Sequence, residues 1–226
     1  MSALGSIGKH LVPHLSGMAP DVTTSFVREA LHRAIHGVGP FPPAAKAADE
    51  QLREQRGNVD RAVGEVIENH VRFAGAQGFL TNIGGLMTAA VMIPANITGL
   101  ALIECRMIAG IAHLRGYDLD DPRVRNAILT CMLGEEHVNK LVKQRKLPAP
   151  PMALATAPAH DPHLDRIISA EAASELITRV AGKRLALSVS RRVPVLGGLV
   201  GAGADGYATW KVGRYADREF LPRAKR

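Results

Sequence analysis

The sequence predicts an all-α protein, a bundle of about seven or eight helices around a central glycine-rich apolar hairpin. Ala, Val, Leu and Ile supply most of the apolar content, whereas only 4% of the residues are aromatic. This composition favours closely packed helices over a β-sandwich. A sheet would also need alternating apolar and polar residues between turn signals. No such run occurs in the sequence.

Four parts can be separated along the 226 residues, a length that fits one domain. Residues 1–20 are punctuated by glycine and proline, and we expect them to be loosely ordered. Residues 21–145 are the predicted helical core, which contains the apolar hairpin at 79–115. Residues 146–163 are rich in proline and alanine and are expected to form a linker. Residues 164–226 are expected to form two helices that pack on the same core and end in a basic tail.

Three helices are predicted before the hairpin. The first begins at Asp21 and ends at Gly37, because Asp is a good N-cap and Gly is common after the last helical residue. The second, residues 44–56, is polar and should lie on the surface. The third, residues 62–74, is amphipathic, and His70 lies on its apolar side.

The hairpin is the most apolar part of the chain. Residues 73–103 contain no Asp, Glu, Lys or Arg. A bilayer span needs about 20 apolar residues, so this stretch is long enough for one. Three environments remain open for it: the interior of a soluble bundle, contact with one side of a membrane, and a true span.

Glycine and proline inside the stretch argue against one straight helix. Gly84 and Gly85 lower helix propensity, and Pro94 removes a backbone donor. We therefore predict two shorter apolar helices, residues 81–93 and 95–114, hinged near Pro94.

The remaining helices are predicted from sequence signals at their N-termini. Pro122 suits the first position of a helix. Glu135 and Glu136 follow Gly134, where acidic residues favour a helix start. Asp161 and Pro162 then begin a long helix.

The last segment is rich in glycine. Gly201, Gly203 and Gly206 satisfy the pattern G-x-G-x-x-G. A dinucleotide site, however, needs a strand before the glycines and a second parallel strand that carries an acidic residue, and both are missing from the sequence here. Small residues spaced by four instead predict close helix packing. The residues assigned to helix packing are Gly84, Gly85, Pro94, Gly197 and Gly201.

Polar residues on the second hairpin arm are the candidates for a site. Glu104 lies on an apolar face, and a buried carboxylate needs hydrogen bonds or a cation. We expect His70 or Arg72 to be its partner. Two interpretations remain open: a structural tie between helices, and the polar pocket of an enzyme or ligand-binding protein. The pocket would be formed by His70, Glu104, Arg106 and His113. No catalytic residue can be assigned.

No metal or cofactor is predicted. Glu29, His32 and His36 share one helical sector that could hold a metal ion, but the sector faces solvent and no fourth ligand is implied.

The net charge of +7 suits an anionic membrane surface or a membrane protein partner. Nucleic acid is not favoured, because no aromatic residues interleave with the basic ones to form a base-stacking groove. The N-terminus lacks the pattern of a secretory signal, so we expect a cytoplasmic protein at the inner face of the membrane. The residues expected to contact an anionic surface are Lys211, Arg214, Arg218, Arg223, Lys225 and Arg226.

Three segments together resemble the EcsC protein family, over roughly residues 40–220. They are ENHVRFAGAQGFLTNIGGLMT (68–88), RMIAGIAHLRGYDLDDP (106–122) and VPVLGGLVGAGADGYATWKVGRYADREF (193–220). The family is similar to a bacterial protein encoded beside an ABC transporter. The resemblance therefore implies a membrane-associated accessory or interaction protein with no defined reaction, and it carries over no catalytic residue.

Overall fold

The structure is a computed structural model that describes residues 20–83, 89–189 and 194–223. Nine α-helices lie in these ranges, with one isolated bridge between Val38 and Phe41 and no strand among them, so the all-α prediction is confirmed. The four long helices are α4 (Val59–Ile83), α5 (Ala89–Leu114), α9 (Pro162–Val189) and α10 (Pro194–Glu219). The five shorter ones are α2 (Pro20–His36), α3 (Ala44–Glu54), α6 (Pro122–Cys131), α7 (Glu135–Lys143) and α8 (Pro151–Ala155).

Helix ends follow the local sequence signals. Gly37 ends α2 with a φ of +90°, and a Cβ there would lie 2.9 Å from the Phe41 carbonyl oxygen. Only glycine adopts this conformation without strain. At the start of α6, the Asp121 carboxylate accepts a hydrogen bond of 2.8 Å from the Arg123 backbone N–H, with Pro122 in the first turn.

The core is built around the second half of α5, which packs against α2, α3, α4, α9 and α10. Its buried side chains meet others from α6 and α9, and the largest of these have less than 2% of their surface exposed. These fully buried side chains include Met107, Ile108, Ile111, Ile128, Leu129, Met132, Ile168 and Leu176. The apolar stretch therefore ends inside a protein core from Ile97 onward.

Two glycines allow α10 to lie close to α4. A Cβ at Gly206 would sit 3.4 Å from Val71 Cγ1, and one at Gly213 would sit 3.1 Å from Ile67. The two helices are antiparallel neighbours, since the later glycine meets the earlier residue of α4. Of the residues assigned to packing, Gly197 and Gly201 lie in the first turns of α10, and Gly84 and Gly85 lie outside the described residues.

Two expectations need correction. Pro94 does not separate two helices, because it lies within α5, in the second turn after Ala89, where few backbone bonds precede it. Residues 146–163 are not a loose linker. They contain α8, bury Leu147 and Leu154, and the Met152 N–H donates to Glu219 Oε2 at 3.0 Å.

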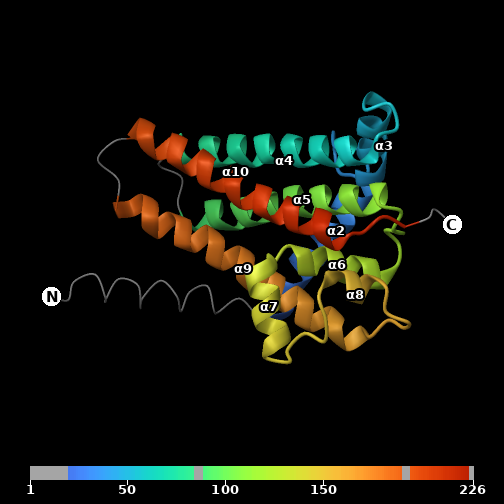
Figure 1. The fold of residues 1–226 in the computed structure, drawn as a ribbon. Coiled ribbons are helices and arrows are strands. Elements are labelled where there is room, and N and C mark those ends of the chain that lie inside the picture. The colour runs from blue at the N-terminus through green and yellow to red at the C-terminus, as the bar shows by residue number, and fades with distance from the viewer. Residues whose placement is uncertain (1–19, 84–88, 190–193, 224–226) are drawn as a thin grey trace.

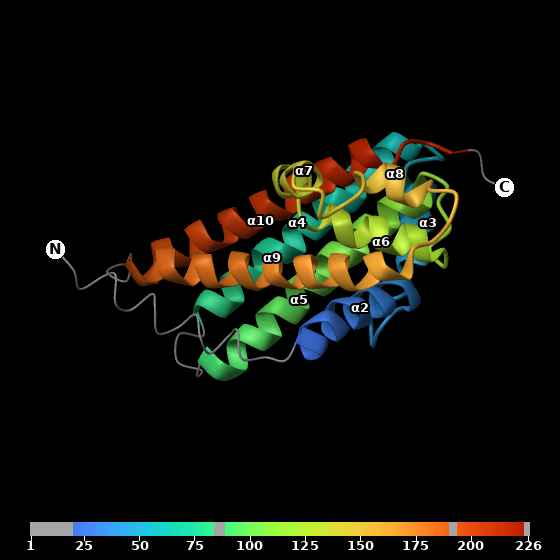
Figure 2. The ribbon, with the colours of Figure 1, turned by 90° about the horizontal axis from the view of Figure 1, so that it is seen from below.

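The bundle has two unequal halves (Figures 1 and 2). The shorter helices surround one half, which we call the body. The ends of α4 and α9 and the starts of α5 and α10 extend beyond the body on the other side, and we call them the free ends. The described residues that follow α10 lie at the body side (Figure 1).

Candidate functional site

A buried ion pair joins α5 to α9. The Glu104 side chain has 0% of its surface exposed, and its Oε1 and Oε2 accept hydrogen bonds of 2.8 and 3.2 Å from Arg179 Nη1. Arg179 Nη2 also donates to the carbonyl oxygen of Met132, just after α6. The guanidinium therefore stabilises the buried carboxylate and ties three helices together.

The same guanidinium begins a polar chain that reaches α7. Arg179 Nε donates to Glu175 Oε1 at 3.1 Å, and Glu175 Oε2 lies 2.9 Å from His137 Nδ1. On its other side, His137 Nε2 lies 3.5 Å from Glu171 Oε2. Val138 and Leu141 of α7 are buried beneath this chain, so it fastens a short amphipathic helix to the core.

The structure corrects the expected partner of Glu104. We expected His70 or Arg72, but the described partner is Arg179, whereas Arg72 pairs with Glu68 at 3.1 Å. The sequence contained a signal for this pairing, because Arg179 lies three residues after Leu176 on the apolar side of a long helix. We had named only Arg72 and His70 because they directly precede the apolar stretch.

His70 is a neutral, locally satisfied side chain. Its Nδ1 lies 2.7 Å from the Val66 carbonyl oxygen, and because a carbonyl only accepts, Nδ1 carries the proton. Burial lowers the pKa of His70 to about 4; the bond to Val66 opposes this shift, and the positive charge of Arg106 adds to it. An imidazole held neutral in this way does not store a proton near neutral pH.

Arg106 is fixed by the α2–α3 connection. Its Nη1 donates to the Pro42 carbonyl oxygen, and its guanidinium lies 5.7 Å from the centre of the Phe41 ring. Only 9% of its surface is exposed, and this burial lowers its pKa. Its hydrogen bond and ring contact hold the connection between the two helices in place.

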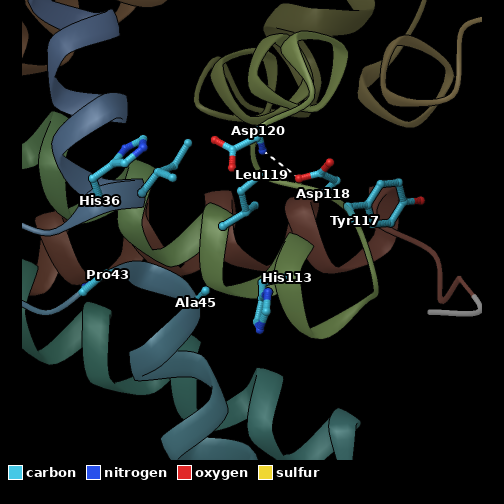
Figure 3. Close-up of a pocket in the computed structure, with 9 residues that line it drawn as sticks. His36, Pro43, Ala45, His113, Tyr117, Asp118, Leu119 and Asp120 are labelled. Atoms are coloured by element: carbon cyan, nitrogen blue, oxygen red, sulfur yellow. Dashed lines mark hydrogen bonds between the residues drawn. The ribbon is translucent and has the colours of Figure 1, made fainter. Parts of the chain in front are cut away.

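His113 is the only one of the four candidates that lines the hollow described here. Its Nε2 lies 2.8 Å from Asp49 Oδ1 of α3. A shallow hollow of about 390 Å³ lies between the end of α2 and the loop after α5. Figure 3 shows the residues that line it. In this view the His113 ring points away from Asp118 and Asp120, and Asp118 accepts a hydrogen bond from the Asp120 backbone N–H at 2.9 Å.

The four candidate residues therefore do not meet at one place within the described part of the chain. Glu104 faces α9, Arg106 faces the α2–α3 connection, and His113 faces α3. Catalysis by a general acid and base needs both groups within reach of one substrate. The arrangement fits ties between helices.

Two further ties were missed in the sequence. Asn126 Nδ2 donates to Asp165 Oδ1 at 2.8 Å, and Arg28 lies 3.5 Å from the same carboxylate oxygen. Arg115 bridges Asp60 and Asp217 at 2.7 and 2.6 Å. An asparagine within an apolar helix pattern was the available signal for the first tie.

Among the described residues, no group of three or more His, Cys, Asp or Glu side chains is arranged so that it could hold a metal ion. In the sector considered from the sequence, Glu29 pairs with Arg33 at 2.6 Å and His32 stacks on His36. Cys105 and Cys131 are buried free thiols, and burial raises both pKa values, so they behave as apolar side chains.

The basic residues of α10 have carboxylate neighbours. Lys211 lies 3.6 Å from Glu136, Arg214 3.2 Å from Asp217 and Arg218 2.5 Å from Glu135. The pairs of Lys211 and Arg218 are exposed on both sides, so each stabilises the fold little, whereas Asp217 in the third pair is mostly buried.

The basic residues beyond α10 are partly fixed to the body. Arg223 is held to the loop after α5, because its N–H donates to the Arg115 carbonyl oxygen at 2.8 Å and its guanidinium lies over Tyr117. Lys225 and Arg226 lie outside the described residues.

Taken together, these contacts define a helical-bundle protein whose buried polar groups join its helices. The chain belongs to the EcsC protein family, whose profile matches residues 1–224, beyond the 40–220 expected. Comparisons with curated proteins and with solved structures found no match. Family membership is therefore established, and it brings no defined reaction with it.

Proposed function

We propose that this EcsC-family protein is a membrane-associated accessory protein, with no defined reaction, that contacts a bilayer with its free ends. The observation that carries the proposal is the place of the charge-free stretch. Residues 73–103 contain no charged side chain. Of the described ones, residues 73–83 end α4 and residues 89–96 begin α5, and these helix ends extend beyond the body (Figures 1 and 2). Apolar helix ends beyond a packed body are suited to lipid contact.

A single bilayer span is the weaker alternative. Among the described residues, Ile97–Leu114 of α5 is long and apolar enough to cross a membrane, with a mean hydropathy of 1.5. However, 67% of this window is buried by protein, and it contains Glu104 in its ion pair with Arg179. The core helix of a soluble body accounts for the window.

The charge distribution also favours the free ends over the C-terminal tail. Between Glu175 and Asp205 the sequence has no carboxylate, and the last part of α9 in this interval carries Lys183 and Arg184. An anionic membrane attracts such a region, at about 1 kcal/mol per cation close to the surface. Residues 220–223, which begin the C-terminal tail after α10, lie by contrast at the opposite side of the bundle (Figure 1). We therefore assign the tail at most a long-range steering role.

Flotation of the purified protein with vesicles tests the proposal. We expect the protein to rise with vesicles of phosphatidylcholine and phosphatidylglycerol, and to remain bound in about 1 M salt, where charges more than a few ångströms apart are screened. A monodisperse protein that stays at the bottom of the gradient with every vesicle would overturn the proposal. Deletion of residues 211–226 is not a usable control, because Val212, Tyr215 and Phe220 belong to the core.

A further inference from the structure

Two aromatic side chains on α10 are exposed although the fold gives them no role. Tyr207 has 63% and Trp210 has 45% of its surface exposed, and their rings stack with centres 6.0 Å apart. One turn apart on the helix, they form a continuous apolar surface, which we call the aromatic pair. Trp210 is the only tryptophan of the chain.

The aromatic pair lies between a basic and an uncharged part of one exposed stripe. Gly203, Tyr207, Trp210, Arg214 and Arg218 are all exposed and follow helical spacing along one side of α10. Glycine lies toward the free end and the arginines toward the body. In membrane-bound proteins, basic residues lie at the lipid headgroups, aromatic residues at the interface and uncharged residues among the acyl chains. The stripe on α10 has its residues in this order.

A third exposed aromatic residue lies at the same level on the neighbouring helix. The contacts of Gly206 with Val71 and of Gly213 with Ile67 set the antiparallel register of α10 and α4. This register places Phe73, which is 55% exposed, opposite Tyr207 along the axis. Phe73 is also where the charge-free stretch begins. Aromatic residues on two helices thus mark one level around the bundle, the border between body and free ends.

The length of chain beyond this border sets how deep the free ends can reach. At about 1.5 Å per residue, the part of α4 from Phe73 to Ile83 is about 15 Å long, and the part of α10 from Pro194 to Tyr207 is about 20 Å long. The hydrocarbon core of a bilayer is about 30 Å thick. The free ends therefore match one leaflet and are too short to cross both.

We infer that Tyr207, Trp210 and Phe73 lie at the headgroup boundary of an anionic bilayer, so that the free ends enter one leaflet only. This inference rests on the proposed membrane association and adds the depth and the residues that set it. The two cations nearest the border on the exposed side of α10, Lys211 and Arg214, then lie at the level of the lipid phosphates. The ion pair of Lys211 with Glu136 is exposed, so phosphate can replace the carboxylate. Asp217 is also held by Arg115 at 2.6 Å, so Arg214, which is 47% exposed, can turn to a phosphate without leaving that carboxylate unpaired.

Fluorescence of the unmodified protein tests the depth, because all tryptophan emission comes from Trp210. The protein is mixed with vesicles of phosphatidylcholine and phosphatidylglycerol whose acyl chains carry bromine either near the glycerol or near the terminal methyl group. We expect a blue shift and stronger quenching by the shallow bromine. Binding without quenching by either lipid would overturn the inference while leaving the proposed function in place. Stronger quenching by the deep bromine would overturn it too, and absence of binding to these protein-free vesicles would overturn both and favour a membrane protein partner.

A pair of variants provides a second measurement. Replacing both Tyr207 and Trp210 by Ala removes two aromatic side chains that the lipid interface would partly bury. We therefore expect about tenfold weaker vesicle binding. The matched control is Leu221→Ala, since Leu221 is 51% exposed but follows α10 at the body side. We expect less than a twofold change for the control. Equal effects of the two variants would contradict the inference, provided that both retain the helical circular dichroism of the parent protein.

Discussion

The Glu104 carboxylate and the Arg179 guanidinium form a pair across α5 and α9, with Nη1 2.8 Å from Oε1 and with the carboxylate completely buried. The pair lies 75 positions apart in the chain. It joins the helix that contains the apolar stretch to the helix that runs beside it toward the free ends. Loss of one partner of such a pair costs more than loss of both, because a buried charge is left without its counter-ion.

We therefore expect Arg179→Met to lower the free energy of unfolding by about 3–5 kcal/mol. The double variant Arg179→Met with Glu104→Leu should recover much of this loss, because neither charge is then buried. Urea denaturation of both variants measures the difference. Arg166→Met on the exposed side of α9 is the control and should change the stability by less than about 0.5 kcal/mol. A loss below about 1 kcal/mol for Arg179→Met would contradict this role of the pair.

Two glycine replacements should have opposite effects. A Cβ at Gly213 would lie 3.0 Å from Met107 Sδ and 3.1 Å from Ile67, so in Gly213→Ala these buried side chains must give way by a few tenths of an ångström. We expect it to destabilise the protein by about 1–3 kcal/mol. Gly64→Ala in α4 meets no atom within 4 Å and should stabilise by about 0.5–1 kcal/mol. Thermal unfolding of the two variants and the parent protein measures both effects. Equal shifts of the two melting temperatures would argue against close α4–α10 packing.

The burial of His70 predicts a pH dependence of stability. Its pKa falls from about 6.5 in the unfolded chain to about 4 in the fold. Between these values the unfolded chain binds more protons, so stability decreases as the pH falls from 6.5 toward 4, by at most about 3 kcal/mol from this residue. The gap in unfolding free energy between the parent protein and His70→Gln should narrow over this range. A gap that is constant from pH 7 to about 4 would mean that His70 is not held neutral.

Cations close to the aromatic pair should contribute more to vesicle binding than cations far from it. We expect Lys211→Gln to weaken binding about fivefold at low salt, which corresponds to about 1 kcal/mol for a cation at the surface. Arg223→Gln should change binding by less than twofold, because Arg223 is held on the body side next to Tyr117. Lipid titrations compare the two. A larger effect at Arg223 would mean that the basic tail makes the contact.

Local signals predicted the helices well. Asp121 and Pro122 begin α6, and Gly37 ends α2, because capping and backbone conformation depend on neighbours in sequence. Pro94 misled the prediction of a hinge, since the effect of proline depends on its distance from a helix start that apolar residues alone do not reveal. Pro150 and Pro151 suggested a linker, although Pro151 begins α8.

The polar contacts were harder to predict than the helices. The sequence showed that Glu104 needs a partner, but the choice of Arg179 depends on how α5 and α9 are packed, which no local pattern specifies. The same holds for the tie between Asn126 and Asp165. The sequence also did not predict that the aromatic pair and Phe73 lie at one level, because this depends on the register in which α4 and α10 pack.

Hydrogen–deuterium exchange with and without anionic vesicles tests most directly whether the free ends contact lipid. We predict slower exchange in peptides covering residues 77–96 and 194–206 when vesicles are present, and unchanged exchange in α3, α6 and α8 of the body. Protection confined to the body, or to the C-terminal residues after Glu219, would contradict the account.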